Sequence, residues 1–476
     1  MEGGTVLGAR DKHRNMAGKP FMRQLSVAST VWTIYFISGL GLGAPTVYMA
    51  QIKKESNSTF DTSPNIVAWL YSVFGYSAIP WVVAVGVVTE KFGRKKPILI
   101  GSVFFVTSFI IFYTSKSSIQ LLIYEIMYSS ALGYGTTICI LIVTEYTSPK
   151  YRGIFLAIKS ASGFWGVWVS NAIGTYCHWR NIAIIGVVCS LYPLSAVFWT
   201  ESPVWLASKG RFDDCTASHR QLKGQDSESE KELANLIASQ KNKAKPVTFR
   251  RAVVLKEFYK PILLSIFMIL QYHFSGKFVC SIYALEVIKK ITASEETAYM
   301  GMLILDGFTV FSMYVGCVLS KFFKRRHMYL TSSLMANIFL YIISLYLYLV
   351  KCNFITENKV VSVMLLAILN IFLSCGPVIF STSISGEILP IRFKMAGIIV
   401  NGLTFNLTLS TVLKISPYLF KEFGTHGAFL FYALAVTILT YLLYKYMPET
   451  KDKTLQEIEM YFKDVKTDES TRLMNK

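Results

Sequence analysis

Apolar stretches of about 20 residues recur along this chain, the length at which an α-helix crosses the hydrocarbon core of a bilayer. Transmembrane β-strands would instead read as segments of roughly ten residues with alternating polarity, and no such alternation is present. We therefore expect an all-α membrane protein with twelve transmembrane helices. The predicted spans are 27–50, 65–88, 98–115, 119–143, 154–176, 181–199, 259–282, 297–320, 328–350, 359–384, 395–417 and 427–446.

The composition supports this class. The 476 residues are 53% hydrophobic and 16% charged, whereas soluble domains carry about 25% charged residues. The formal net charge of +19 could indicate a nucleic-acid partner, but most basic residues fall on one side of the predicted membrane. This placement follows the positive-inside rule, so we expect both termini in the cytosol, a lipid bilayer as partner and no nucleic acid.

The spans form two groups of six that a polar segment separates. The prediction is a cytosolic N-terminal tail, a first six-helix half, a cytosolic linker with amphipathic helices, a second six-helix half and a cytosolic C-terminal tail. The tail at the N-terminus has basic residues but no apolar core, so we expect no cleavable signal there. These segments cover residues 1–26, 27–199, 200–258, 259–446 and 447–476 respectively.

Charge motifs repeat at matching places in the two halves. The loop after the second span reads "GVVTEKFGRKK", and the loop after the eighth reads "SKFFKRR". Glu145 precedes Arg152 by seven positions, and Glu387 precedes Lys394 by the same number. Repeats of this kind predict pseudo-symmetric halves with a substrate site between them, near the middle of the membrane.

These motifs resemble the sugar porter branch of the major facilitator superfamily, close to the insect facilitated trehalose transporters. The resemblance also includes "TEYTSPKYRG", "TESPVWLASKGR", "GEILPIRFKMAG" and "MPETKDKTLQEIE", in the expected order. It implies that a set of charged residues closes the cytosolic side when the pathway opens outward. The alternative is that these residues only set topology, but topology does not need carboxylates. The implied gate consists of Glu90, Arg94, Glu145, Arg152, Glu201, Arg325, Arg326, Glu387, Lys394 and Glu449.

The substrate positions depart from the family pattern. Two Gln of the seventh helix become Tyr272 and His273, and the Asn that follows them becomes Phe278. The family pattern also has a Gln in the fifth helix, a Trp in the tenth, and an Asn and a Trp in the eleventh. Other residue types stand at these positions here, among them Phe405. Losing several amides should weaken binding of an ordinary hexose, unless neighbouring polar residues rebuild the set. The predicted substrate-binding residues are Ser160, Gln271, Tyr272, His273, Lys277, Thr309, Thr382 and Asn406.

Several ionisable residues lie within predicted spans, where a charge costs ~2.5–3.5 kcal/mol even on the lenient insertion scale and usually faces a cavity or a partner. His273 and Lys277 are four positions apart, which predicts that they share one helix face. Lys277 or His273 contacts an anionic or otherwise polar ligand, or Lys277 is held by Asp306 or reaches the outer interface. Glu125 is a candidate partner for Lys159, and both pairings stay open at this stage.

The predicted function is facilitated transport of a sugar or a similar small polar solute. The first span has no ionisable residue, and Glu125 stands where proton-coupled relatives have Arg. This favours uniport, although His273 and Glu125 keep a proton route open. The alternatives are a non-transporting solute sensor or receptor on the same scaffold, and a carrier of a non-sugar organic solute.

Other classes of function find no support in the sequence. No nucleophile–base–acid set is visible, so an enzyme is not expected. The eight Cys are scattered without metal-ligand spacing, so we expect no metal and no cofactor. Asn57 in "NST" is the candidate glycosylation acceptor. We expect a monomer in the cell membrane.

Overall fold

The computed structural model describes residues 4–55, 60–61, 63–241, 255–292, 295–389, 393–451, 453 and 455–462. Nearly all of these residues are helical, and the described residues contain no β-strand. The predicted all-α fold is therefore confirmed. The candidate glycosylation site Asn57 lies outside the described residues.

The first half of the chain folds into six membrane-length crossings, the second and sixth of which are each built from two consecutive helices. Its helices are α1 (Gly4–Lys54), α2 (Pro64–Leu70), α3 (Val73–Phe92), α4 (Lys95–Thr114), α5 (Ser118–Tyr146), α6 (Pro149–Tyr176), α7 (Asn181–Leu191) and the 3₁₀-helix η1 (Tyr192–Phe198).

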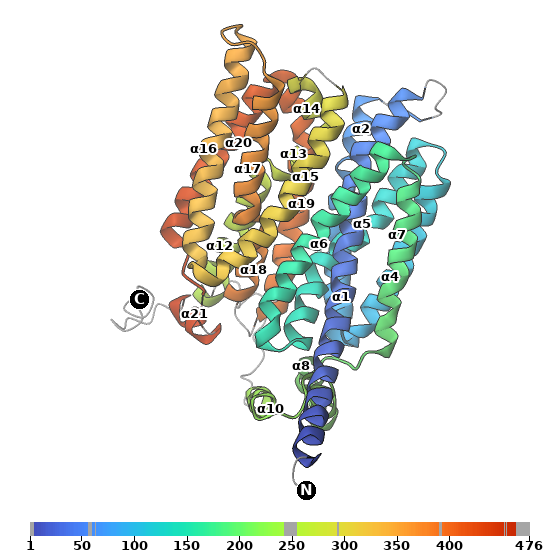
Figure 1. Ribbon diagram of the computed structural model, residues 1–476, viewed down its shortest axis with the longest axis vertical. Coiled ribbons are helices and arrows are strands. Elements are labelled where there is room, and N and C mark those ends of the chain that lie inside the picture. Colours follow the sequence, from blue (N-terminus) through green and yellow to red (C-terminus); the bar gives the residue numbers. More distant parts are fainter. Residues whose placement is uncertain are drawn as a thin grey trace.

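Three short helices follow and lie at one end of the bundle, close to the start of α1 (Figure 1). They are α8 (Pro203–Ser208), α9 (Phe212–Lys223) and α10 (Ser227–Lys241). Leu206, Cys215 and Leu233 form a small apolar cluster between them. The predicted amphipathic linker helices are thus present. We call this end of the bundle the linker end and the opposite end the far end.

The second half repeats the six crossings beside the first (Figure 1). Its helices are α12 (Lys256–Phe274), α13 (Lys277–Ile282), α14 (Ala284–Thr292), α15 (Glu295–Phe322), α16 (Arg325–Lys351), α17 (Lys359–Cys375), α18 (Pro377–Ile388), α19 (Lys394–Glu422), α20 (Gly424–Tyr446) and α21 (Leu455–Phe462). The short α21 lies near the linker end.

Eleven of the described membrane-length crossings are apolar enough to span a bilayer. The twelfth is α6, which is 28 residues long but carries Lys159, Ser170 and Asn171 as buried polar residues. This helix packs against α1 in its own half and against α15 in the other half. Because α6 faces protein on both sides, it does not need the hydropathy of a lipid-facing helix.

Two crossings of the second half are interrupted where the backbone cannot continue as a helix. Gly276 adopts φ +75° between α12 and α13, a conformation that residues with a Cβ rarely adopt. Gly376 and Pro377 separate α17 from α18, and proline cannot donate the hydrogen bond that would continue the helix. The seventh and tenth predicted spans are therefore each built from two helices.

Glycines allow α1 and α6 to approach each other closely. A Cβ on Gly39 would lie 1.8 Å from the carbonyl oxygen of Gly163, and a Cβ on Gly166 would lie 2.2 Å from that of Phe36. Both neighbours are backbone atoms, so a side chain at either glycine would force the helices apart. Small residues at such crossings are typical of membrane helix packing.

Candidate functional site

A cavity of about 140 Å³ lies between the two halves. Helices α1, α5 and α6 line it from the first half, and α12, α13, α18 and α19 line it from the second. Most lining side chains are apolar, and aromatic rings come from Phe164, Phe278 and Phe405. The sequence repeat predicts a substrate site between the pseudo-symmetric halves, and the cavity lies at this position.

Three of the predicted substrate residues line this cavity, namely Ser160, Tyr272 and Thr382. The other five do not line it. Gln271 donates from Nε2 to the Thr440 hydroxyl at 2.7 Å, which ties α12 to α20. The amide of Asn406 contacts its own helix and, at 3.3 Å, the Thr136 hydroxyl of the other half. The side chains of Gln271 and Asn406 therefore hold helices together. Substrate binding by any of the eight predicted residues remains a prediction.

His273 lies behind the cavity wall. Its ring is stacked on Phe278 with centroids 5.5 Å apart and meets Phe405 edge-on at 4.5 Å. Nδ1 contacts the Ile269 carbonyl oxygen of the same helix at 2.8 Å. The prediction that His273 and Lys277 share one helix face is wrong, because the chain breaks at Gly276 between them.

Lys277 is fully buried in a polar cluster between helices of the second half. Its Nζ donates to the Thr309 hydroxyl and to Asn370 Oδ1, each at 2.6 Å. Asp306 instead accepts from Asn171 Nδ2 at 2.6 Å, a contact that joins α15 to α6 across the halves. Lys277 and Asp306 interact electrostatically without forming an ion pair. Residues Asn171 and Asn370 were missed by the sequence analysis, since nothing in the sequence marks which helices meet.

Glu125 and Lys159 are not partners. The carboxylate of Glu125 accepts a hydrogen bond from the Tyr48 hydroxyl at 3.1 Å, and Glu125 is fully buried and does not line the cavity. Lys159 lines the cavity, with its Nζ 4.7 Å from the centroid of the Tyr35 ring. The structure thus places one of the ionisable residues predicted within the spans directly in the cavity wall.

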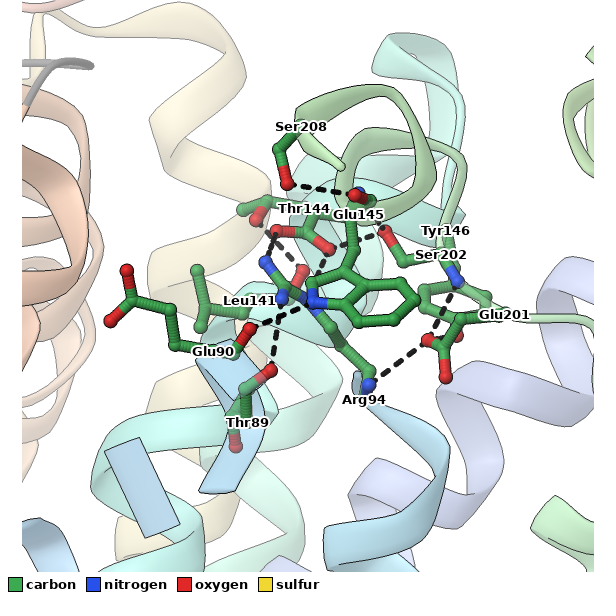
Figure 2. Close-up of polar contacts among 11 residues, drawn as sticks. Thr89, Glu90, Arg94, Leu141, Thr144, Glu145, Tyr146, Glu201, Ser202 and Ser208 are labelled. Atoms are coloured by element: carbon green, nitrogen blue, oxygen red, sulfur yellow. Dashed lines mark hydrogen bonds and ion pairs between the residues drawn. The ribbon is translucent and has the colours of Figure 1, made fainter. Parts of the chain in front are cut away.

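At the linker end, the first-half gate residues Arg94, Glu145 and Glu201 form a tight cluster (Figure 2). The Arg94 guanidinium donates to both carboxylate oxygens of Glu145, at 2.7 and 2.6 Å. Glu201 accepts from the Arg94 backbone N–H at 2.9 Å, and the Ser202 hydroxyl donates to Glu145 at 2.5 Å. The carboxylate of Glu90 is exposed and points away from this cluster.

The second half repeats these contacts with its own residues. Arg325 pairs with Glu387 as Arg94 pairs with Glu145. Glu449 accepts from the backbone N–H groups of Arg325 and Arg326, each at 3.1 Å, as Glu201 does from Arg94. In both halves a carboxylate thus caps the start of a transmembrane helix, where backbone N–H groups lack partners.

The gate residues do not form ion pairs between the halves among the described contacts. Arg152 nevertheless interacts electrostatically with Glu232 of α10 and, more weakly, with Glu387 of the second half, and Lys394 interacts with Glu145 of the first half. What bridges the halves here is apolar: Leu141 of the first half packs with a second-half cluster that includes Leu389 and Ile398. Leu389 and Ile398 also line the cavity, so this apolar contact forms its boundary toward the linker end.

The far end of the cavity is closed by polar and aromatic contacts between the halves. The Thr46 hydroxyl donates to the Ile282 carbonyl oxygen at 2.6 Å, which joins α1 to α13. The rings of Tyr71 and Tyr283 lie 4.6 Å apart. An exposed ion pair of 3.3 Å between Lys53 and Glu286 joins α1 to α14.

Comparison with known proteins identifies the family. Residues 24–462 match the family described as "Sugar (and other) transporter". The chain belongs to this sugar transporter family. The match covers both halves, the linker and all of the described C-terminal residues, so the family is established for nearly the whole chain.

Relatives of this sugar transporter family member include several named "Facilitated trehalose transporter Tret1". The protein of Apis mellifera ligustica is 21% identical over 96% of this chain and 91% of its own length. That of Bombyx mori is 22% identical over 89% of this chain and 84% of its own length. That of Drosophila virilis is 23% identical over 84% of this chain but only 44% of its own length.

Solved structures share the fold. The major facilitator superfamily proton:xylose symporter XylE, bound to 6-bromo-6-deoxy-D-glucose, superposes with a TM-score of 0.77 at 17% identity, covering 93% of this chain and 99% of that one. The inward-open xylose transporter XylE from E. coli superposes with a TM-score of 0.70 at 15% identity, covering 92% and 99%. The family match confirms the predicted sugar transporter family, and these structures confirm the twelve-helix fold.

Proposed function

We propose that this protein is a facilitative carrier that moves a sugar or a similar small polar solute across the cell membrane by alternating access. The observation that carries the proposal is the cavity between the halves, closed at the far end by direct contacts and bounded toward the linker end by an apolar cluster. A solute could leave such a cavity by separating the halves at one end while the other end stays closed. Sugars are the first candidates because the relatives are named as trehalose transporters.

The charged clusters fit a role as a gate at the linker end. Glu145 and Glu387 are each already paired with an arginine of their own half. Each also interacts electrostatically with a cation of the opposite half, Glu387 with Arg152 and Glu145 with Lys394. Closing the linker end would shorten these reciprocal distances and strengthen the attraction, since ion-pair energy rises as charges approach. A solute sensor would have less need of such a device, so transport is the better proposal. By the same proposal the linker end and both termini are cytosolic.

Uniport is favoured because the described part of α1 within its span offers no acidic group for proton coupling. Glu125 is fully buried, accepts a hydrogen bond from Tyr48 and does not line the cavity. The relatives are named as transporters, which agrees with the expectation that the chain is not an enzyme. We further propose that the monomer is the functional unit, because the cavity is complete within one chain.

Uptake into liposomes tests the proposal. Purified protein in liposomes is expected to equilibrate at least one labelled solute from a panel of trehalose, glucose, fructose and small organic anions, with saturable kinetics and without an ion gradient. Imposing a pH gradient should leave the final inside-to-outside ratio at about one, because a uniporter cannot couple to protons. Protein-free vesicles are the control. Flux no greater than in these vesicles would refute the proposal, and accumulation driven by the pH gradient would refute uniport.

A further inference from the structure

We propose that the solute carries an anionic group, such as a carboxylate, which pairs with Lys159 inside the cavity. The inference rests on the proposed function, because it assigns a class of solute to the same cavity. It is carried by an ammonium group in the cavity wall that has no counter-ion among the described residues.

Lys159 is buried, with only 2% of the residue exposed, and it lines the cavity from α6. Its ammonium lies over the face of the Tyr35 ring, with Nζ 4.7 Å from the ring centroid. A ring face attracts a cation but accepts no conventional hydrogen bond from it. A lysine ammonium has three N–H donors, and no described side chain or carbonyl accepts from this one. These donors remain available to a solute in the cavity.

The acidic groups that could neutralise Lys159 are engaged elsewhere. Glu125 is bound by Tyr48, and Asp306 is bound by Asn171 and interacts with Lys277. No Asp or Glu is found among the described residues that line the cavity. The lining therefore carries one positive charge when Lys159 is protonated, and apolar walls screen that charge less than water does.

The rest of the lining indicates a small solute with an apolar body and few polar groups, although Asn401 Oδ1 in the wall has no described hydrogen-bond partner. The hydroxyls of Ser38 and Thr136 donate to carbonyl oxygens of their own helices, each at 2.9 Å, so they are not free donors for a polyol. The rings of Phe164, Phe278 and Phe405 provide apolar surface. An engineered cavity of about 150 Å³ accommodates benzene. The space of about 140 Å³ thus suits a small organic monoanion with a body of roughly one six-membered ring.

Binding of matched neutral and anionic probes tests this assignment. Thermal stabilisation of the purified protein is titrated with glucuronate against glucose, and with benzoate against benzyl alcohol. We expect at least one anion to bind about tenfold more tightly than its neutral counterpart. Lys159→Gln should abolish the difference and Lys159→Arg should keep it, because only the latter retains the charge. Lys351→Gln, at the exposed end of α16, is the matched control and should behave as wild type.

The result that overturns the inference is equal or tighter binding of the neutral member in both pairs, or an anion preference that survives Lys159→Gln. Lys159→Met serves as a second neutral variant if Lys159→Gln does not fold. Uptake of the same probes into liposomes separates the two proposals. Glucose flux without any anion preference would overturn this inference and leave the carrier intact. An anion preference in binding without flux of any probe would instead support the inference and refute the transport proposal.

Discussion

Gly39→Ala is expected to prevent α1 and α6 from packing and to reduce sharply the yield of folded protein. The added Cβ would lie 1.8 Å from the Gly163 carbonyl oxygen and 3.0 Å from the Gly166 Cα. Backbone atoms cannot rotate away, so the two helices must separate along their whole contact. Overpacking typically costs about 1–3 kcal/mol and occasionally more, and we expect this substitution to lie at or above the upper end. Thermal unfolding of the purified protein measures the loss.

Gly153→Ala on α6 is the matched control for this prediction. No atom lies within 4 Å of the Cβ that it would add. Replacing a helical glycine by alanine where space allows stabilises by roughly 0.5–1 kcal/mol. We expect a midpoint equal to or slightly above wild type. Wild-type stability of Gly39→Ala would show that α1 and α6 do not meet as described here.

Arg94→Leu is expected to destabilise the first half strongly, because it leaves Glu145 buried without its cation. The two side chains are 10% and 8% exposed. Removing one partner of a buried ion pair typically costs about 3–5 kcal/mol. The double variant Arg94→Leu/Glu145→Leu should be more stable than the single variant, since no unpaired charge remains. Unfolding midpoints of both variants and wild type provide the comparison.

We expect a smaller loss of stability when Arg325, the second-half equivalent of Arg94, is replaced. Arg325 and Glu387 are 26% and 28% exposed, so water can solvate Glu387 when its partner is lost. Arg325→Leu should therefore cost only about 1 kcal/mol. Equal losses in Arg94→Leu and Arg325→Leu would contradict the difference in burial between these otherwise repeated clusters.

The sequence predicted the helices well because the bilayer imposes a length and a hydropathy on each of them. The exception is the helix α6. The fifth crossing, α6, is the least apolar, since both of its faces meet protein and it carries cavity residues. The predicted repeat of charge motifs also corresponds to repeated contacts around Arg94 and Arg325. These motifs were predictable because each cluster forms between segments next to the loops of its own half.

The cavity was less predictable because its residues depend on helix register and on breaks. The break at Gly276 removes Lys277 from the face of His273. The partners of Lys277, Thr309 and Asn370, come from two other helices, 32 and 93 residues away in sequence. Lys159 was noticed as an ionisable residue within a span, but its place in the cavity wall required the structure.

Distances between spin labels in lipid nanodiscs test alternating access most directly. One pair, Lys53→Cys and Glu286→Cys, reports on the far end, where both side chains are exposed. A second pair, Lys150→Cys and Lys321→Cys, reports on the linker end, again from exposed positions. The exposed native Cys177 and Cys352 are replaced by Ser in both backgrounds. Losing the Lys53–Glu286 ion pair should have little effect, because exposed pairs contribute about 0.2–1 kcal/mol.

Alternating access predicts two populations for each pair, with opposite responses. Under conditions that lengthen the far-end distance, the linker-end distance should shorten, and a transported solute should shift both distributions together. A single unchanged distance at both ends, with and without solutes that the protein binds, would contradict the account and indicate a static binding protein.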